Sequence, residues 1–460
     1  MNDSGTIAAI ATPQGTGGIS VIRISGANAV EIADKIFTGQ SLKTAKTHTI
    51  HYGFIKNKAG DKIDEVLVSV MLAPKTFTRE DTVEISCHGG NVPTRAVLKC
   101  VIEAGARMAQ PGEFTKRAFM NGRIDLSRAE AVIDVINSKN ELSRRNAVMQ
   151  LSGSLAGSIK SLRDKLINLL AQMQVIIDYP DEDLEDVTQA DIEEICRSCA
   201  EKTQQLIKTS ESGRIIRDGI RTAIVGKPNV GKSSILNFLA GDDRAIVTSV
   251  AGTTRDVIEE NISLNGIPLV LSDTAGIHDT EDTVEKIGVE KSRRYLDAAD
   301  LVMVVLDASE TIDENDMEVL RASEGKKRII LLNKSDIMSQ GDGIESNFCG
   351  ADGEKVPCIR VSAKTGEGMD RLAEEISSIC SLDEIDAENG AVITNMRHKT
   401  ALINAHEALV GAVIALESGM PADVVSIDIS SAADSLGEIT GETVSESVVD
   451  EIFHNFCVGK

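Results

Sequence analysis

The sequence predicts a multidomain α/β and α+β fold: an N-terminal α+β domain, a helical domain formed by two chain segments, and an inserted α/β domain with a doubly wound parallel sheet. Three patterns predict it. Strand-like runs and helices mix over the first 122 residues, apolar residues recur at helical spacing in residues 125–219 and after Ser381, and strands alternate with helices over residues 220–380. The expected domains are residues 1–122, 123–218, 219–381 and 382–460.

The N-terminal domain is expected to bury a small sheet. The predicted strands are residues 6–12, 19–24, 66–72 and 81–86, and the predicted helices are residues 27–37 and 92–103. A glycine-rich loop, residues 13–18, joins the first two strands.

The two helical segments each carry apolar faces. One face groups Leu126, Ala129, Ile133 and Ile136, and another groups Ile159, Leu162, Leu166, Leu169, Met173 and Ile176. The helical pattern resumes at residues 402–413 and closes with a predicted capping box, Thr443-Val-Ser-Glu446. Because both segments must cover their apolar faces, we expect them to pack together.

The α/β domain opens with a phosphate-binding loop. A strand-like run, residues 220–225, precedes Gly226-Lys-Pro-Asn-Val-Gly231-Lys232-Ser233, and a helical pattern follows. This is the order that the G-x-x-x-x-G-K-[ST] motif requires. Gly226 and Gly231 let backbone N–H groups surround an anion. Lys232 would reach the outer phosphates and Ser233 would bind Mg²⁺.

Three further motifs follow in order and predict a Ras-like P-loop GTPase domain. Asp273-Thr-Ala-Gly276 ends the strand 267–271 and places a carboxylate near Mg²⁺, while a hydroxyl of Thr253-Thr254 could complete the Mg²⁺ shell. Asn333-Lys-Ser-Asp336 follows the strand 328–332, and its aspartate would accept hydrogen bonds from guanine that adenine cannot supply. Ser362-Ala-Lys364 follows the strand 356–361 and would contact the base. The residues expected to bind GTP are Asn229, Val230, Gly231, Lys232, Ser233, Ser234, Thr248, Ser249, Val250, Ala251, Gly252, Thr253, Thr254, Asp273, Thr274, Ala275, Gly276, Asn333, Lys334, Ser335, Asp336, Ser362, Ala363 and Lys364.

Hydrolysis needs a group that this GTPase domain does not supply in the Ras-like way. Ile277 stands where a Ras-like switch has a glutamine that orients water. Glu285 is the candidate to position water, with Asp282 and Glu281 as alternatives, and any of these acids also fits an exposed helix start. The positive charge for the transition state could come from a monovalent cation, for which Asn229 offers a carbonyl oxygen, or from a partner's side chain.

Composition limits the possible functions. The chain carries 48 Lys and Arg against 71 Asp and Glu, a net charge of −23, so a nucleic-acid substrate would need a partner for much of its binding. We expect no membrane span, because no apolar stretch approaches the required length. The N-terminus has no basic region before Arg23, and eight cysteines in 460 residues fit a reducing cytosol, so we expect a cytoplasmic protein.

Two local patterns have alternative readings. Cys196 and Cys199 form a C-x-x-C in a helical pattern; ordinary helix-face cysteines are the simpler interpretation, and a metal or redox role the alternative. The acidic run at residues 178–186 is either a solvated connection between helices or a metal site.

The sequence as a whole resembles one family, the tRNA uridine-5-carboxymethylaminomethyl modification GTPases of the MnmE/TrmE type. The resemblance is carried by the GTPase motifs and by seven other blocks. These are Thr6-Ile-Ala-Ala-Ile-Ala-Thr-Pro13, Gly17-Gly-Ile-Ser-Val-Ile-Arg-Ile-Ser-Gly26, Glu84-Ile-Ser-Cys-His-Gly-Gly90, Pro111-Gly-Glu-Phe-Thr-Lys-Arg-Ala-Phe119, Asn121-Gly-Arg-Ile-Asp-Leu126, Leu436-Gly-Glu-Ile-Thr-Gly-Glu442 and the terminal Phe456-Cys-Val-Gly-Lys460.

The resemblance implies a homodimer joined through an N-terminal domain that binds a tetrahydrofolate derivative, in the 5-formyl or methylene form. Together with an FAD-dependent partner of the MnmG/GidA type, in a heterotetramer, members add an aminomethyl-type group to carbon 5 of the wobble uridine of certain tRNAs. GTP hydrolysis depends on K⁺ and accompanies approach of the two GTPase domains.

Site residues follow from the same resemblance. Asn229, Thr248, Val250 and Thr253 would surround K⁺, Ser233 and Thr254 would bind Mg²⁺, and Glu285 falls on the position that orients water. The folate positions map to Arg23, Glu84, Arg123 and Lys460. A carboxylate with basic groups suits a pterin and a glutamate tail, although Arg23 and Glu84 could also form a plain strand-end ion pair.

Some residues depart from the family pattern or keep two readings. Arg123 replaces a common lysine, Val458 an isoleucine, and His278 an arginine. Cys457 is either chemically active beside the folate site or a buried structural cysteine.

A second function remains as an alternative: a ribosome-assembly or RNA-binding GTPase switch without base chemistry. The N-terminal domain and the Cys457-Val-Gly-Lys460 tail argue against it, because a plain assembly switch has no use for either.

Overall fold

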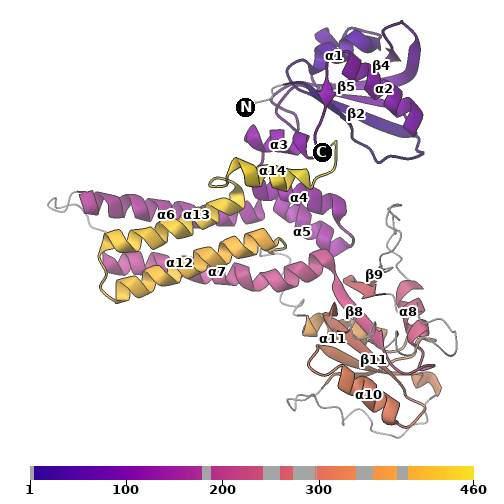
Figure 1. The fold of residues 1–460 in the computed structure, drawn as a ribbon, viewed down its shortest axis with the longest axis vertical. Coiled ribbons are helices and arrows are strands. Elements are labelled where there is room, and N and C mark those ends of the chain that lie inside the picture. Colours follow the sequence, from indigo (N-terminus) through magenta and orange to yellow (C-terminus); the bar gives the residue numbers. More distant parts are fainter. Residues whose placement is uncertain are drawn as a thin grey trace. The chain divides into compact units, whose positions relative to one another are not determined.

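The structure is a computed structural model and describes residues 5–178, 188–241, 259–272, 296, 298–337, 356–380 and 392–459. The chain divides into two compact units (Figure 1). The first unit comprises Met1–Ile133, Gln150–Asn168 and Ala433–Lys460, and the second comprises Asp134–Met149 and Leu169–Ala432.

The first unit contains a seven-stranded sheet in the order β3-β4-β5-β6-β2-β1-β7. Its strands are antiparallel except for the parallel pair β1 and β7. The strands are β1 Ile7–Ile10, β2 Ile19–Ser25, β3 Phe37–Thr38, β4 Thr49–Lys56, β5 Lys62–Met71, β6 Thr82–His88 and β7 Arg107–Met108. The helices α1 (Ala29–Ile36) and α2 (Asn91–Glu103) bury their apolar faces against this sheet, which confirms the predicted α+β fold.

Alternation along β2 separates the two faces of the sheet. Ile22 and Ile24 are fully buried in the core that α1 and α2 cover. Arg23, between them, points to the other face, because successive side chains on a strand alternate. There its guanidinium lies 5.7 Å from the centre of the Phe114 ring in α3 (Glu113–Met120).

The C-terminal segment of the chain belongs to the same unit. Val449 and Phe453 of α14 (Glu446–His454) and Phe456 form a buried cluster with Leu126 and Ala129 of α4 (Leu126–Asn137). Lys116 of α3 also pairs with Asp450 of α14. This packing holds the end of the chain against residues more than 300 positions earlier.

The predicted capping box at the start of this last helix is wrong. The helix begins at Glu446 with Ser445 as its N-cap residue, and that cap makes no side-chain hydrogen bond. The Thr443 hydroxyl instead donates to the carbonyl of Asp434, at 2.8 Å. The Thr443 hydroxyl, which the local pattern assigned to the start of α14, is therefore bonded to the preceding helix α13 instead.

The second unit contains a pair of long antiparallel helices from distant parts of the sequence. α7 (Gln189–Asp218) and α12 (Met396–Glu417) run side by side: Gln189 donates to the carbonyl of Leu416, and the Ile393 amide donates to Thr209. This confirms the helical domain formed by two chain segments. Three further helices have residues in both units: α5 Glu141–Ser152, α6 Ser154–Asp178 and α13 Ala422–Thr440.

The predicted apolar faces are largely buried. Ile159, Leu162, Leu166, Leu169 and Met173 of α6 are all buried, whereas the side chain of Ile176 lies outside the described residues. In α4, Leu126 and Ala129 are fully buried and Ile133 is partly buried against the same cluster, but Ile136 is 43% exposed. Ile136 lies in the last turn of its helix, where the apolar spacing no longer meets the core.

One helix in the described ranges is long and apolar enough to cross a membrane, contrary to the expectation that none would be. It is α12, whose most apolar window has a mean hydropathy of 1.3 and is 39% buried. The buried residues of α12, among them Leu402, Leu409 and Leu416, recur at helical spacing, and Arg197 of α7 pairs with Glu417 at its end. This stripe is typical of a helix in a bundle.

The second unit also contains a six-stranded sheet in the order β13-β12-β11-β8-β10-β9. The strands are parallel except for the hairpin of β9 and β10, and apolar clusters lie on both faces, which confirms the doubly wound arrangement. The strands are β8 Ile220–Val225, β9 Glu259–Leu264, β10 Ile267–Ser272, β11 Leu301–Asp307, β12 Arg328–Asn333 and β13 Cys358–Arg360; the helices are α8 Lys232–Gly241, α10 Glu314–Ala322 and α11 Met369–Ile379. Of the helix predicted at residues 287–296, only Leu296 lies within the described residues. Residues 179–186 of the acidic run lie outside them.

Candidate functional site

The phosphate-binding loop lies where the sequence predicts, between β8 and α8. Gly226 and Gly231 have φ angles of 158° and 96°. A Cβ on Gly226 would lie 2.3 Å from the carbonyl oxygen of Val305, and one on Gly231 would lie 2.2 Å from the side-chain amide of Asn333. Both positions therefore require glycine for close approach as well as for conformation. Asn229 also has a left-handed backbone, with φ of 65°.

Lys232 folds over this loop. Its ammonium donates to the carbonyls of Gly226 and Lys227, at 2.8 and 2.7 Å. Burial lowers the pKa of Lys232. The lysine thus lies among backbone dipoles of the loop, beside the N-terminus of α8, the arrangement that binds phosphate in such motifs.

Asn333 connects three of the predicted nucleotide motifs. It is 3% exposed, its amide donates to the carbonyl of Val230 at 2.8 Å, and its side-chain oxygen accepts from the amide of Ala363 at 3.2 Å. One buried side chain therefore holds the phosphate-binding loop and the base-contact segment to the end of β12.

The two motifs that are predicted to bind the base also contact each other. The hydroxyl of Ser362, fully buried, donates to the exposed carboxylate of Asp336 at 2.9 Å. This bond fixes the orientation of the carboxylate predicted to read guanine. Lys334, with φ of 67°, pairs with Asp307 at the end of β11. Although burial raises the pKa of Asp307, hydrogen bonds from Lys334 and Ser309 hold it below its usual value.

Sequence reasoning missed an acidic cluster around Lys227. Its ammonium lies 3.0 Å from Glu310, 3.2 Å from Asp313 and 3.1 Å from Asp316. The hydrogen bonds that its ammonium donates to these three carboxylates raise the pKa of Lys227. Asp313 and Asp316 also form a capping box at the start of α10. The spacing Asp313-x-x-Asp316 is a visible helix-start signal, but its pairing with the phosphate-binding loop is not visible in the sequence.

The remaining predicted nucleotide residues lie outside the described part of the chain. They are Thr248, Ser249, Val250, Ala251, Gly252, Thr253, Thr254, Asp273, Thr274, Ala275, Gly276 and Glu285, with the alternatives Glu281 and Asp282. The K⁺ and Mg²⁺ assignments that depend on them stay predictions. Among the residues that the structure places, Ser233, Ser234, Ser335 and Lys364 lie in the expected loops and helix starts.

The folate positions taken from the resemblance converge in the first unit. Arg23 donates to Glu84 across the paired strands β2 and β6 at 2.8 Å, and its guanidinium also donates to the carbonyl of Gly459 at 3.4 Å. A Cβ on Gly459 would lie 2.3 Å from the carbonyl oxygen of Ile10. The C-terminal tail therefore packs directly on the sheet beside Arg23, although Lys460 itself lies outside the described residues.

Arg123 joins this group through Phe77, which sequence reasoning missed. The Arg123 guanidinium donates to the Phe77 carbonyl at 3.0 Å and lies 4.8 Å from the centre of its ring, while Arg23 lies 6.0 Å from the same ring. Burial and then the neighbouring charges of Arg128 and Arg79 lower the pKa of Arg123. Two arginines on one aromatic ring give a site with positive charge and a flat apolar surface.

The cysteines differ in environment. Cys457 is exposed, so its interpretation as a buried structural cysteine is wrong. Cys196 and Cys199 are fully buried in α7, and burial raises the pKa of Cys196 to about 12. Within the described ranges no group of three His, Cys, Asp or Glu side chains is placed to hold a metal.

The fold and the loop geometry define a P-loop nucleotide-binding domain of the GTPase type, carried by a chain with an additional α+β domain and a two-segment helical domain. Comparison with known proteins extends this class. A model of the MnmE helical domain matches residues 126–457, and a model of the GTP-binding protein TrmE N-terminus matches residues 6–123.

The chain is 51% identical to the tRNA modification GTPase MnmE of Acetivibrio thermocellus over 464 residues, covering all of both chains. It is 48% identical to the protein of that name from Ligilactobacillus salivarius, covering 99% of this chain and 98% of the relative. The G domain of the T. maritima FeoB iron transporter, a solved structure, is 28% identical, with a TM-score of 0.27, and covers 34% of this chain and 96% of that one. Because these two MnmE relatives match over nearly the full length of both chains, the chain belongs to the MnmE family of tRNA modification GTPases.

Proposed function

We propose that this chain is the GTP-hydrolysing subunit of a complex that, with an FAD-dependent partner, adds a carboxymethylaminomethyl or aminomethyl group to carbon 5 of the wobble uridine of certain tRNAs. A tetrahydrofolate derivative, in the 5-formyl or methylene form, donates the carbon. The observation that supports this most is that Arg23 contacts both Glu84 and Gly459 of the C-terminal tail. Arg23 and Gly459 are 436 residues apart in sequence. An assembly switch would have no need for that site.

The residues around Phe77 fit such a folate. The Glu84 carboxylate can accept hydrogen bonds from the donor edge of a pterin, and Arg23 or Arg123 can pair with a carboxylate of the glutamate tail. The ion pair between Arg23 and Glu84 is the plain alternative, and a bound pterin would compete with it. Cys457 is exposed, and its backbone carbonyl accepts a hydrogen bond from the Gly112 amide, at 3.3 Å.

The nucleotide site would hold GTP and Mg²⁺ through the residues described above, with Ser233 and Thr254 as Mg²⁺ ligands. Asn229, Thr248, Val250 and Thr253 would hold K⁺, and the ion would supply the positive charge for the transition state. Glu285 would position the attacking water. We retain the homodimer, the heterotetramer with the FAD-dependent partner, the cytoplasmic location and the predicted domain boundaries as parts of this proposal.

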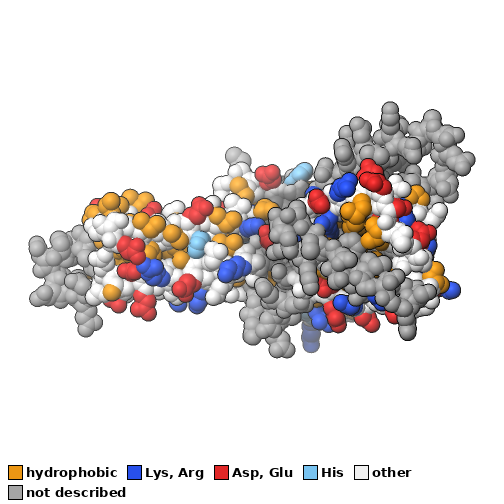
Figure 2. All heavy atoms as spheres, turned by 90° about the horizontal axis from the view of Figure 1, so that it is seen from below, with side chains coloured by type: hydrophobic (Ala, Val, Ile, Leu, Met, Phe, Trp, Pro, Cys, Tyr) orange, Lys and Arg blue, Asp and Glu red, His pale blue; other side chains and the backbone are white. Residues whose placement is uncertain are grey.

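The acidic character of the chain agrees with a shared role in tRNA binding. On the face shown in Figure 2, Lys and Arg side chains lie among Asp and Glu side chains. With a net charge of −23, binding to a phosphate backbone is expected to depend on the partner.

Two measurements on the full-length protein test the proposal. GTP turnover should be faster in K⁺ than in Na⁺ at equal ionic strength, and equal rates would remove the cation assignment. The protein should also bind 5-formyltetrahydrofolate, and Glu84→Gln should weaken that binding without changing GTP affinity. Arg321→Gln, at an exposed position of α10, serves as the charge-loss control.

A further inference from the structure

A separate hollow lies at the start of α2, on the opposite face of the N-terminal sheet from Arg23 and Glu84. Ile10 and Ser20 line it together with residues of α2. Ile10 pairs with Ile22 across the strands, and Ser20 lies two positions before Ile22, so both point to the face that α2 covers. The hollow is therefore distinct from the group of residues around Phe77.

Two glycine-rich loops build this hollow. A Cβ on Gly89 would lie 2.1 Å from the carbonyl oxygen of Gly17, and the Gly89 amide donates to the carbonyl of Gly18 at 3.3 Å. Gly90, the residue before α2, has φ of 113°. The loop 13–18 and the loop before α2 thus meet backbone to backbone, which side chains at these positions would prevent.

A buried hydroxyl in the hollow has no oxygen or nitrogen partner. Thr94 is 4% exposed, and its Oγ1 makes no hydrogen bond to an oxygen or nitrogen of the described residues. The thiol of Cys87 interacts with this hydroxyl only as a weak sulfur acceptor, and it itself donates to the carbonyl of Ser20, at 3.5 Å. A buried hydroxyl without a proper partner is costly in the unliganded protein, so it indicates a group supplied from outside.

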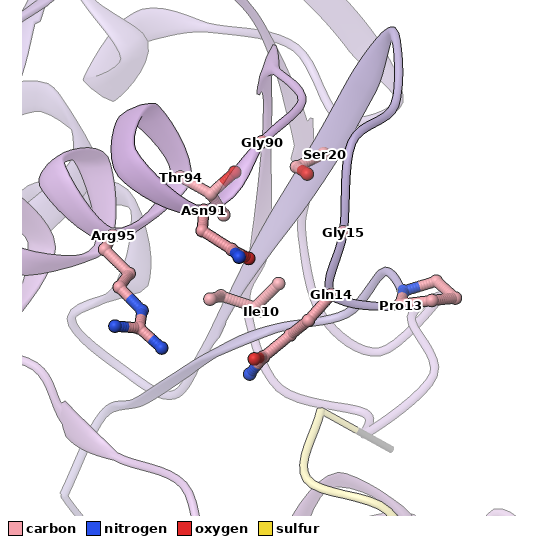
Figure 3. Close-up of a pocket in the computed structure, with 9 residues that line it drawn as sticks. All are labelled: Ile10, Pro13, Gln14, Gly15, Ser20, Gly90, Asn91, Thr94 and Arg95. Atoms are coloured by element: carbon pink, nitrogen blue, oxygen red, sulfur yellow. The ribbon is translucent and has the colours of Figure 1, made fainter. Parts of the chain in front are cut away.

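The other polar side chains around the hollow can all donate hydrogen bonds. Figure 3 shows Asn91, Thr94 and Arg95 projecting from the first two turns of α2, with Gln14 extending from the opposite loop. Arg95 is exposed and makes no ion pair with any residue that the structure describes. The first turn of α2 contains no acidic residue, and no carboxylate lines the hollow. The positive end of this 13-residue helix adds to the same field.

We propose that this hollow binds an oxyanion group, a phosphate or a carboxylate, at the end of a larger ligand. The enclosed space is only about 10 Å³, room for roughly one oxygen atom, so the rest of the group would lie at the open mouth. Arg95 and Asn91 would donate to the oxygens at the mouth, and Thr94 would donate from the interior.

Protection of Arg95 from modification by phenylglyoxal tests this site. The full-length protein is saturated with GDP and Mg²⁺ to occupy the phosphate-binding loop, and modified arginines are quantified by peptide mass spectrometry. Separate arms contain inorganic phosphate and acetate at equal ionic strength, with chloride as reference. We expect one or both anions to slow modification of Arg95, while Arg371, exposed on α11, reacts at an unchanged rate and serves as the internal control. Protection by phosphate alone identifies a phosphate ligand, and protection by acetate alone identifies a carboxylate ligand.

Thr94→Val separates binding from folding. The variant should need about tenfold more anion for the same protection, because it loses a hydrogen bond to a charged group. Its thermal unfolding midpoint should stay equal or rise, since an unsatisfied buried hydroxyl is removed. Thr115→Val is the matched control: Thr115 is also fully buried with an unpartnered hydroxyl, but it lies in α3 away from the hollow. Equal modification of Arg95 with and without either anion, or unchanged protection in Thr94→Val, would overturn the proposal.

Discussion

Replacing Asn333 by alanine should loosen the nucleotide site before any ligand binds. The substitution leaves the carbonyl of Val230 and the amide of Ala363 without the side chain that holds both. Val230 is 1% exposed, and an unsatisfied buried polar group costs about 1–3 kcal/mol. Ala363 is only half-buried, so water can replace its partner at the lower end of that range. Together we expect a loss of about 2–4 kcal/mol, localised to these segments.

Amide hydrogen exchange measures this loss where it occurs. Since about 1.4 kcal/mol corresponds to tenfold in an equilibrium constant, exchange in the peptides that contain residues 226–231 and 361–366 should accelerate by roughly 30-fold or more. GDP affinity should fall at least about tenfold, because binding must then re-order both segments. Asn315→Ala, at an exposed position of α10, is the control and should change neither. Unchanged exchange in the Asn333 variant would refute the role assigned to this side chain.

Three further predictions concern other residues. Lys227→Met should weaken GTP affinity more than it lowers kcat, because it releases the phosphate-binding loop from Glu310, Asp313 and Asp316; steady-state kinetics with an unchanged KM would contradict this. Glu285→Ala should lower turnover while nucleotide affinity stays nearly intact, and lost affinity would make the residue structural. Burial raises the pKa of Glu113, but bonds from Arg107, the Gln110 amide and Arg117 outweigh it and leave the pKa lowered. Its folded-state pKa lies below the unfolded value, so its stabilisation is present above about pH 4.5 and is lost as pH falls through the folded pKa. Glu113→Gln should therefore flatten the acid limb of thermal unfolding profiles, and parallel profiles would exclude this role.

Motifs that depend on local spacing could be predicted from the sequence. The phosphate-binding loop needs glycine at two positions for backbone reasons, and the strand before Asn333 contains a continuous apolar run, so the order of the motifs already predicts a nucleotide site. That the two helical segments pack together, as α7 and α12 do, likewise follows from apolar faces that need cover.

Contacts between distant segments could not be predicted in this way. Nothing local marks Lys227 as the partner of Glu310, Asp313 and Asp316, which lie before and at the start of α10. Phe77 likewise has no motif that marks it as the ring between Arg23 and Arg123. The capping box expected at Thr443 was wrong because its hydroxyl donates to a carbonyl of another helix, that of Asp434 in α13, nine residues earlier. The hairpin strand β9, which pairs with β10, and the edge pair β3 and β4 were also missed.

Mass spectrometry of tRNA nucleosides tests the central claim most directly. Cells that lack this protein should lose the C5 aminomethyl-type groups of wobble uridines, and the wild-type gene should restore them. Complementation with a variant changed at both Arg23 and Glu84 should fail although its GTP hydrolysis persists. An unchanged set of wobble uridines in the deletion strain would contradict the proposed base chemistry and favour a GTPase switch that acts on RNA without modifying it.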